Sequence, residues 1–352
     1  MEDEITLRQM GPADGPAIDL LGRQTPDTGA IAFYTRFLYD PYRTLMALHP
    51  GVVGVVAEAP GREGLVGMGL VTFGECWYEG AIRPYAYLGG LSVHPDYRRR
   101  GIASRLAAWR VAAARERFGK DCVIFAGIQG GNVGSLRTAE SWSNLRVDGH
   151  SEAAVVKMNR KPPKAVPGLK VRPARPEEYE EIVQKQDAAY RDYNLYPPQS
   201  AEDLSRWLGE SAFGHHLHDY LVVVDREGNI IAGMGVTLEG SLISGRVVKM
   251  PTLLRAANLF LRVVPPDGTV RRLSGERFWF APGQVRAGRF LWESARWLLR
   301  ERGTNLTLFY DPHSPLRGGI VLPRLAPKAG GGSIVLNAPV PMREGRLVYW
   351  SI

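Results

Sequence analysis

The residues best suited to chemistry form a basic, glycine-containing turn between an apolar strand and an alanine-rich helix. The chain there reads Leu91-Ser-Val-His-Pro-Asp-Tyr-Arg98-Arg-Arg-Gly101-Ile-Ala103. Such a turn aims several backbone N–H groups and the positive end of a helix dipole at one point, where an anion binds well. Gly101 and Ala103 keep side chains out of the way, and three successive arginines add positive charge. The sequence therefore predicts a site for a phosphate-bearing cofactor.

The spacing of this turn resembles a family signature. Arg98-x-x-Gly101-x-Ala103 is similar to the Arg/Gln-x-x-Gly-x-Gly/Ala motif of the GNAT superfamily of N-acetyltransferases, and the lead-in from Val93 to Tyr97 is similar too. An ordinary basic turn would also contain such a motif, but the order of strand, proline, arginines, glycine and helix favours the family. The resemblance implies acetyl-CoA as the acyl donor, bound by Leu91, Val93, Arg98, Arg99, Arg100, Gly101, Ile102, Ala103, Ser104 and Asn132.

Two further sequence patterns, one before Leu91 and one at Asn132, support the predicted cofactor site. Gly89-Gly90 allow a local bulge that frees the N–H groups of Leu91 and Val93 for the thioester and the pantetheine arm, although paired glycines also relieve simple packing. Asn132 resembles the start of the family's next cofactor-contacting helix, and asparagine is also a favoured N-cap. Where the family often has a tyrosine as general acid, seven positions later, this chain has Ala139.

Transfer of an acyl group to an amine requires a proton acceptor, and the leaving thiolate benefits from a proton donor. Glu75 and Glu79 lie between the hairpin strand and the strand that begins at Tyr85, near the expected approach of the amine. We predict Glu75 as the base, and Tyr87 as the residue that holds a proton-relaying water or replaces the missing acid. Alternatively, Glu75 is a solvated turn residue and Tyr87 is a half-buried packing residue.

Two histidine-containing segments, at 94 and at 215–218, are predicted to have structural rather than catalytic or metal-binding roles. His94 beside Pro95 is expected to be structural. The tract His215-His216-x-His218 next to Asp219 suggests a metal site by composition, but its spacing matches no zinc motif and no cysteine lies nearby. We therefore expect no metal.

Composition limits the class of protein. At 352 residues, 45% hydrophobic and 23% charged, the chain predicts a globular protein of two domains. The sequence has no apolar run of the roughly 20 residues that a membrane helix needs, no basic and apolar leader after Met1, and only Cys76 and Cys122. A cytoplasmic location is the expectation, without a membrane partner. The net charge of +8 is dispersed, which disfavours nucleic acid and suits a polyanionic cofactor.

The first half predicts alternating strands and helices. Strands are expected at 5–8, 52–58, 65–73, 85–93 and 122–128, and helices at 11–21, at 31–39 and after Gly101. Ile102, Leu106, Trp109 and Ala113 form the apolar side of that last helix, and Gly119 is its expected C-cap. A strand, a crossover helix and a strand imply a parallel pair.

After a stiff connector at 160–168, the same order of elements returns. We therefore expect an α/β fold with mixed sheets, as two GNAT-like acyl-CoA N-acyltransferase domains in tandem, at 1–159 and 169–352. Placing Gly288 against Gly101 puts Val285 in the place of Arg98 and Phe290 in that of Ala103, so the second copy is expected to be degenerate. Strands at 333–336 and 347–352 are expected to complete the second sheet.

The sequence as a whole predicts an N-acetyltransferase that moves an acetyl group from acetyl-CoA to a primary amine by direct attack. The acceptor is expected to be a small molecule or a peptide, and the aromatic segment Phe33–Tyr42 is expected to border its pocket. The alternative is a non-catalytic acyl-CoA sensor or scaffold, and a homodimer is left open.

Overall fold

The computed structural model describes residues 5–26, 32–322 and 331–350. The chain forms two compact units, and each combines segments that lie far apart in the sequence. The first unit comprises Met1–Asp148, Gly245–Pro251 and Gly332–Glu344. The second comprises Gly149–Ser244, Thr252–Gly331 and Gly345–Ile352. The division in space therefore differs from a single boundary at 160–168, which is instead the connection between the two edge strands of the second unit's sheet.

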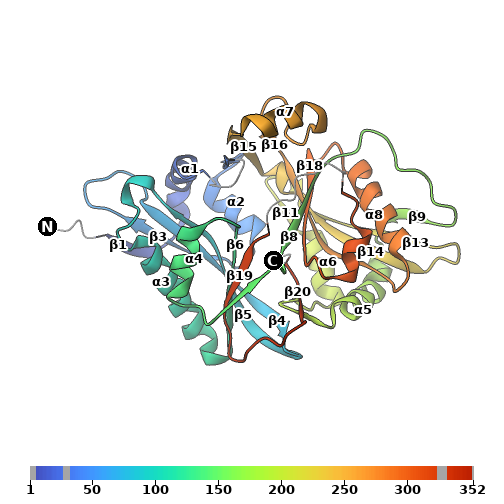
Figure 1. The fold of residues 1–352 in the computed structure, drawn as a ribbon, viewed down its shortest axis with the longest axis horizontal. Coiled ribbons are helices and arrows are strands. Elements are labelled where there is room, and N and C mark those ends of the chain that lie inside the picture. Colours follow the sequence, from blue (N-terminus) through green and yellow to red (C-terminus); the bar gives the residue numbers. More distant parts are fainter. Residues whose placement is uncertain (1–4, 27–31, 323–330, 351–352) are drawn as a thin grey trace. The chain divides into compact units, whose positions relative to one another are not determined.

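The first unit is built on a seven-stranded sheet in the order β1-β3-β4-β5-β6-β19-β7 (Figure 1). Its strands are β1 (Thr6–Gln9), β3 (Val53–Glu58), β4 (Gly67–Tyr78), β5 (Ala81–Val93), β6 (Val123–Ile128), β19 (Ser333–Asn337) and β7 (Leu145–Asp148). All neighbours are antiparallel except β5 and β6, which run parallel as the crossover pattern predicts.

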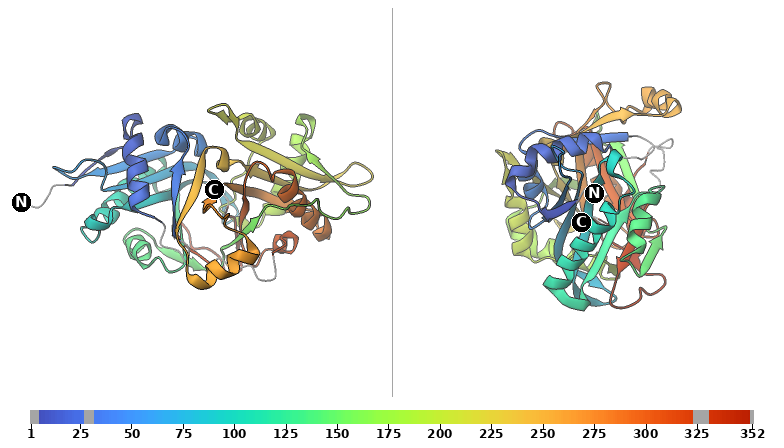
Figure 2. Two further views of the ribbon diagram at one scale, coloured as in Figure 1. Left: turned by 90° about the horizontal axis from the view of Figure 1, so that it is seen from above. Right: turned by 90° about the vertical axis from the view of Figure 1, so that its left-hand side faces the viewer.

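Helices cover both faces of this sheet. On one face α3 (Ile102–Phe118) packs Ile102 and Leu106 against Val55 of β3, and on the other α1 (Gly15–Gln24) packs against Val56. Successive residues of β3 thus serve opposite faces, as strand geometry requires. The helix α2 (Pro41–Leu48) joins α1, and α4 (Val133–Glu140) packs on the α3 face. Figure 2 shows α3 running along the strands it covers.

The helix predicted at 31–39 is wrong, since residues Ala32–Phe37 form strand β2. The segment Ala-Phe-Tyr-Thr-Arg-Phe is rich in aromatic and β-branched residues, which favour a strand. A helix begins only at Pro41, where the Asp40 carboxylate accepts a hydrogen bond from the Arg43 N–H at 2.7 Å and caps it. Strand β2 pairs with β15 (Ile243–Lys249), which lies mostly in the same unit.

The second unit has a six-stranded sheet in the order β8-β18-β17-β14-β13-β9. These strands are β8 (Glu152–Lys157), β18 (Asn305–Tyr310), β17 (Arg272–Phe280), β14 (Ile230–Thr237), β13 (His218–Val224) and β9 (Lys170–Pro173). Short strands β10 (Tyr193–Asn194) and β20 (Leu347–Val348) pair in parallel, β11 (Ser211–Ala212) and β12 (His215–His216) form a small hairpin, and β16 (Thr269–Val270) follows α7. The helices are α5 (Tyr179–Tyr190), α6 (Ala201–Gly209), α7 (Thr252–Leu261) and α8 (Val285–Leu298).

The two large sheets share one pattern of order and direction. Read from β1 or from β9, three antiparallel pairs are followed by a parallel pair and then by an antiparallel strand. In each sheet this antiparallel strand lies far in the sequence from the strand of the parallel pair that it joins. Strand β19 enters the first sheet beside β6, whereas β8 enters the second sheet beside β18.

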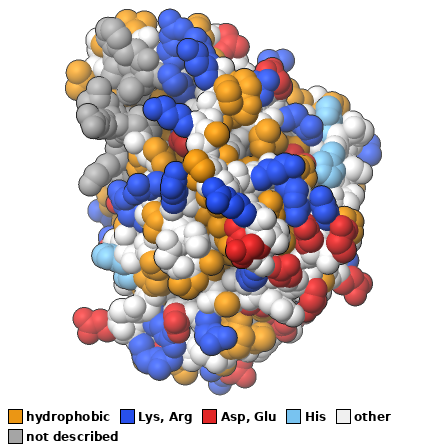
Figure 3. Space-filling view, turned by 90° about the vertical axis from the view of Figure 1, so that its right-hand side faces the viewer, with side chains coloured by type: hydrophobic (Ala, Val, Ile, Leu, Met, Phe, Trp, Pro, Cys, Tyr) orange, Lys and Arg blue, Asp and Glu red, His pale blue; other side chains and the backbone are white. Residues whose placement is uncertain are grey.

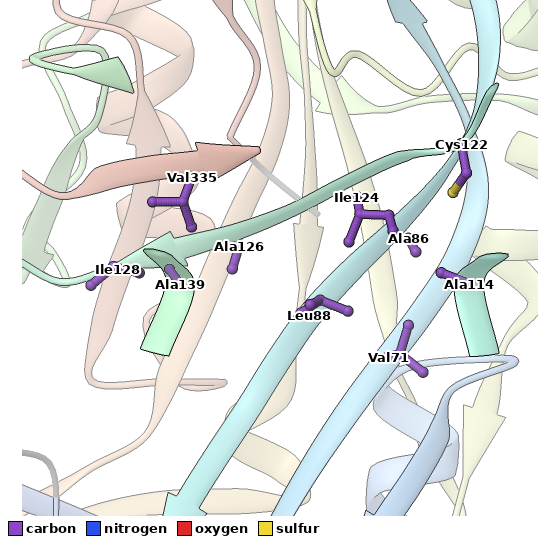
Figure 4. Packing of buried hydrophobic residues seen from close by; sticks show 10 residues of the cluster. All are labelled: Val71, Ala86, Leu88, Ala114, Cys122, Ile124, Ala126, Ile128, Ala139 and Val335. Carbon is purple, nitrogen blue, oxygen red and sulfur yellow. The ribbon is translucent and has the colours of Figure 1, made fainter. Parts of the chain in front are cut away.

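The expectation that residues 333–336 complete the second sheet is therefore wrong. Ile334, Val335 and Leu336 are at most 2% exposed, because β19 is covered on both faces between β6 and β7. Figure 4 shows Val335 among side chains of β4, β5, β6, α3 and α4. A continuous apolar run is typical of such a buried strand, but the run does not specify which sheet receives it.

None of the described helices is long and apolar enough to cross a membrane. On the face of the second unit in Figure 3, lysine and arginine side chains are mixed with acidic and apolar ones rather than gathered into one basic patch. This distribution agrees with the dispersed charge of the sequence.

The insertion of β19 leads to a stability prediction. Ile334→Ala should lower the free energy of unfolding by about 2–5 kcal/mol, as expected for truncation of a buried isoleucine. Ile82→Ala, at a side chain that is 51% exposed on β5, should change it by less than about 0.5 kcal/mol. Denaturant unfolding of both variants measures the difference. Equal stabilities would contradict the placement of β19 inside the first sheet.

Candidate functional site

The predicted anion-binding turn lies between β5 and α3 and spans His94–Gly101. Gly101 is the N-cap of α3 and has φ +73°, a conformation that favours glycine. A Cβ at this position would meet nothing within 4 Å, so the space in front of the main chain is open. Arg99 also has positive φ, +64°. The turn therefore exposes its backbone rather than covering it with side chains.

Backbone donors gather at the start of α3. The first helical hydrogen bond runs from the Arg105 N–H to the Gly101 carbonyl at 3.0 Å. The N–H groups of Ile102, Ala103 and Ser104 consequently lack acceptors within the helix, and the helix dipole adds partial positive charge there. This arrangement is that of an anion site at a helix N-terminus.

The three arginines of the turn are exposed around that point. Arg98 donates from Nε to the Val93 carbonyl at 3.2 Å, and the Arg100 guanidinium lies 4.8 Å from the centre of the Tyr97 ring. His94 is buried beneath them, and burial together with the charge of Arg62 lowers its pKa. A neutral, buried His94 agrees with the structural role expected for it.

The bulge predicted at Gly89-Gly90 is confirmed. Met68 of β4 pairs with Ser92 and Leu70 pairs with Gly89, so Gly90 and Leu91 together oppose Gly69. Gly90 has φ +59°, and a Cβ there would lie 2.9 Å from Leu70. The bulge therefore depends on glycine at this position.

Beside the bulge, β5 and β6 separate. Their pairing among the described residues covers only Tyr85–Tyr87 against Val123–Phe125. The His94 N–H donates toward β4, to the Val66 carbonyl at 2.9 Å. Since alternate N–H groups of a strand point to opposite edges, that of Val93 points to the β6 side, where the ladder has ended, and Leu91 lies in the bulge beside the same gap. The splayed strands and the turn thus offer a row of donors that leads from β5 to α3.

The comparisons with known proteins bear on this arrangement. Residues 18–142 match the model of the acetyltransferase (GNAT) family. The matched segment contains β5, the turn, α3 and α4, which carry the features described above. No curated protein matches the chain.

Solved structures resemble nearly the whole chain. A GCN5-related N-acetyltransferase from Sphaerobacter thermophilus is 15% identical with a TM-score of 0.60, over 97% of this chain and 98% of that one. A Saccharomyces cerevisiae N-myristoyltransferase with bound myristoyl-CoA is 10% identical with a TM-score of 0.63, over 96% and 79%. A GCN5-related N-acetyltransferase from Kribbella flavida is 12% identical with a TM-score of 0.51, over 95% and 71%. The predicted fold class, mixed α/β and GNAT-like, is confirmed.

Asn132 occupies the position expected of an N-cap. Its Oδ1 accepts a hydrogen bond from the Ser135 N–H at 3.1 Å at the start of α4, and the side chain is half-buried. Ala139, on the same helix, is 3% exposed and packs in the core beside β6 and β19. A tyrosine hydroxyl is therefore absent from the place where the family often has its acid.

The two predicted catalytic residues are not brought together. Glu75 pairs with Pro84 and shares its face of β4 with Val71, on the α3 side of the sheet. Tyr87 pairs with Thr72 and points to the opposite face, where its ring lies 5.4 Å from that of Phe125. Burial raises the pKa of Tyr87. The other candidate base, Glu79, is held by Arg343 at 2.6 Å and is 7% exposed at its side chain.

Arg110 is a further residue of this site that was not predicted from the sequence. This arginine of α3 is 2% exposed, and its Nη1 donates to the carbonyls of Leu70 at 3.2 Å and Gly89 at 3.0 Å. Its Nε donates to Leu106 at 3.1 Å, and a Cβ on Gly69 would lie only 2.9 Å from that atom. The two carbonyls belong to the cross-strand pair Leu70–Gly89, which directly adjoins the bulge on one side, so the guanidinium fixes the backbone next to the distortion. The signal in the sequence was a charge between Leu106 and Ala114, on the helix face that should be apolar.

Burial lowers the pKa of Arg110 to about 10, which leaves the guanidinium charged at neutral pH. A buried cation that is satisfied by carbonyls stabilises the bulge only while all its hydrogen bonds persist.

The second sheet contains the same distortion. Gly233 pairs with Trp279 and Gly235 pairs with Glu276, so Arg277 and Phe278 form a bulge at which Arg277 has φ +51°. Strands β17 and β18 pair only up to Gly275 and Leu308. Tyrosine hydroxyls bond to the backbone at this bulge: Tyr349 accepts from the Arg277 N–H at 3.3 Å and Tyr190 donates to the Phe278 carbonyl at 2.6 Å.

The predicted alignment of the second copy is wrong in register. The N-cap of α8 is Gln284, so Val285 and Phe290 lie within the helix rather than in the turn. Gly288 is a packing residue, since a Cβ there would lie 2.4 Å from the Phe280 ring. The turn before α8 has only the four residues Ala281–Gln284, without an arginine, whereas the turn before α3 has eight.

The histidine tract is also dispersed. His218 is hydrogen-bonded to Glu210 and Thr237 at 3.0 Å each and stacks on Trp207, whereas His216 faces Asp219 at 3.6 Å. These side chains have separate partners and do not converge on one point.

The role of Arg110 can be tested through stability and amide exchange. Arg110→Met leaves two buried carbonyls without a donor and should lower the free energy of unfolding by about 2–4 kcal/mol. Amide exchange at Leu91 and Val93 should accelerate in native protein, because the bulge loses its support. Arg117→Met, at an exposed arginine of the same helix that stacks on Phe73, should cost about 1 kcal/mol or less. Unchanged exchange near the bulge in Arg110→Met would contradict the assignment.

Proposed function

We propose that this protein is an N-acetyltransferase that transfers an acetyl group from acetyl-CoA to a primary amine of a small molecule or peptide. The observation that carries the proposal is the open, arginine-ringed turn at Gly101 next to the splayed strands β5 and β6. The match of residues 18–142 to the GNAT family model supports it. The bound myristoyl-CoA of the similar yeast enzyme supports an acyl-CoA donor in general.

The donor is held by main-chain groups. The N–H groups of Ile102, Ala103 and Ser104, with Gly101 open beside them, suit the pyrophosphate, while Arg98, Arg99 and Arg100 supply countercharge. The N–H groups of Leu91 and Val93 suit the thioester and the pantetheine arm, and Asn132 at the start of α4 suits the arm's amides. We therefore expect these residues to hold the thioester along β5.

The reaction is a direct displacement. Acetyl-CoA supplies an activated carbonyl carbon, to which the amine nitrogen forms a bond while the carbon–sulfur bond breaks. A backbone N–H of β5 donates to the carbonyl oxygen as negative charge develops there. One proton must leave the amine and the thiolate must gain one. We assign Tyr87, on the face opposite α3, to the water that carries the proton, and retain Glu75 as base only if the amine approaches from the α3 face.

The gap between β17 and β18 in the second sheet is proposed not to bind acyl-CoA. Tyr190 and Tyr349 already satisfy the bulge of β17, and the short turn before α8 offers neither arginines nor an open glycine N-cap. We infer that the chain carries two copies of one unit, of which the second has lost cofactor binding.

A second candidate function is an acyl-CoA sensor without turnover. It is favoured by Ala139 at the position of the family's acid and by the separation of Glu75 from Tyr87. Binding of acetyl-CoA without CoA release across a broad panel of amines would support the sensor, whereas amine-dependent CoA release would support the enzyme.

The turn can be tested with a matched pair of glycine variants. Gly101→Phe should raise the dissociation constant for acetyl-CoA by at least about 100-fold, equivalent to about 2.7 kcal/mol, because the ring fills the anion site. Gly119→Phe, at the other end of α3 with similar φ (+67°) and equally open space, is a stringent control for backbone strain, because ψ −153° there suits non-glycine residues less than the left-handed conformation of Gly101. Its affinity should match that of the wild type. Equal affinities in both variants would refute the placement.

Binding stoichiometry tests the degenerate second copy. Titration calorimetry with acetyl-CoA should give one site per chain, because tyrosine hydroxyls already bond to the backbone at the second bulge. A stoichiometry of two would overturn this inference. The variant Gly101→Phe serves as control, since it should abolish the single site and leave none.

A further inference from the structure

Three side chains of the second unit that the proposed function does not use converge near the end of β18. They are His150, Asp311 and His313. Each offers one nitrogen or oxygen atom, and these three atoms lie within 4.8 Å of one another. We propose that they form a binding site for a divalent transition metal of the zinc class.

The carboxylate of Asp311 is the fixed point of this cluster. Asp311 follows β18 directly and its side chain is fully buried. Its Oδ1 accepts from the His313 N–H at 2.8 Å, and its Oδ2 accepts from the Val348 N–H at 2.9 Å and faces His150 Nδ1 at 2.7 Å. Two backbone donors therefore fix the orientation of the carboxylate without using all of its lone pairs.

The two imidazoles come from separate segments. His150 lies in the turn between β7 and β8, where its carbonyl accepts from the Trp350 indole N–H at 2.9 Å, and its side chain is 20% exposed. His313 is exposed, and its ring centre lies 5.0 Å from that of His150. Solvent therefore reaches the cluster from the His313 side.

An ion pair explains only part of this geometry. A buried carboxylate needs a partner, and His150 supplies one. The pair does not involve the ring of His313, although that ring centre lies 5.0 Å from the centre of the His150 ring. A metal ion between the three ligand atoms would bind all three groups.

The donor set selects the class of metal. Calcium and magnesium prefer all-oxygen sites, whereas two imidazoles and one carboxylate suit zinc and its neighbours. The present 2.7 Å between His150 and Asp311 is a hydrogen-bond length. Coordination would displace the shared proton and place each ligand atom about 2.1 Å from the ion. Three protein ligands leave one position open, which a water molecule would fill.

Metal binding would also join distant parts of the second unit. The cluster and its hydrogen bonds connect the turn at 149–151, the loop after β18 and the strand β20. A ligand that binds only the folded state raises its stability. Zinc should therefore raise the unfolding temperature as well as bind.

The test uses the full chain after treatment with a chelator. Titration calorimetry with ZnCl2 should give one site per chain, and CoCl2 should produce visible absorption bands. His313→Ala, at an exposed side chain, should weaken zinc binding more than about 100-fold, since loss of a mere outer-shell partner costs about 10–100-fold. His216→Ala is the matched control, because it removes a histidine that faces a carboxylate elsewhere in the same unit.

The result that supports the site is loss of zinc binding in His313→Ala and retention in His216→Ala. No saturable binding to the wild type would overturn the proposal. Binding by His313→Ala equal to that of the wild type would overturn it as well, and loss only in His216→Ala would place the metal in the other histidine tract. Circular dichroism confirms that each variant is folded. Acetyl-CoA affinity is a separate readout, so failure here leaves the proposed function unaffected.

Discussion

The site in the first unit depends on a distortion of one strand. Glycine at position 90 allows β5 to carry an extra residue, and the buried guanidinium of Arg110 holds both carbonyls of the adjoining Leu70–Gly89 pair. Because of this bulge, β5 and β6 separate and the N–H groups of β5 point into the gap. The turn and the first residues of α3 continue the same row of donors. A regular strand would have paired along its full length and left no such edge.

The two large sheets differ in whether side chains of the same unit bond to the backbone at the bulge. Both contain the bulge and the splay at corresponding places, yet only the first leaves them open. In the second, hydroxyl groups of Tyr190 and Tyr349 satisfy the backbone. The shared backbone geometry is therefore a property of the fold, whereas ligand binding depends on whether side chains of the same unit occupy the gap.

Much of the first unit was predictable because its signals are local. The arginine turn, the bulge glycines, α3 with its C-cap at Gly119 and the N-cap at Asn132 are each encoded within a few residues. The strand at 32–37 was predicted as a helix although its aromatic residues favour a strand, because its partner β15 is far away in the sequence. Arg110 was missed because its acceptors are backbone atoms of other strands, and the cluster around Asp311 because His150 joins it only in the folded chain.

The exchange of strands between the sheets has a consequence for how the chain folds. Ser333 pairs with Ile128 and Glu152 pairs with Tyr310, so neither sheet can be completed by its own half of the sequence. During synthesis, the edge of β6 stays unpaired until β19, which lies far later in the sequence, has been made. Contacts this distant slow folding and expose an unpaired apolar edge meanwhile. The two halves therefore reach their native state together, and a cut between them would leave both incomplete.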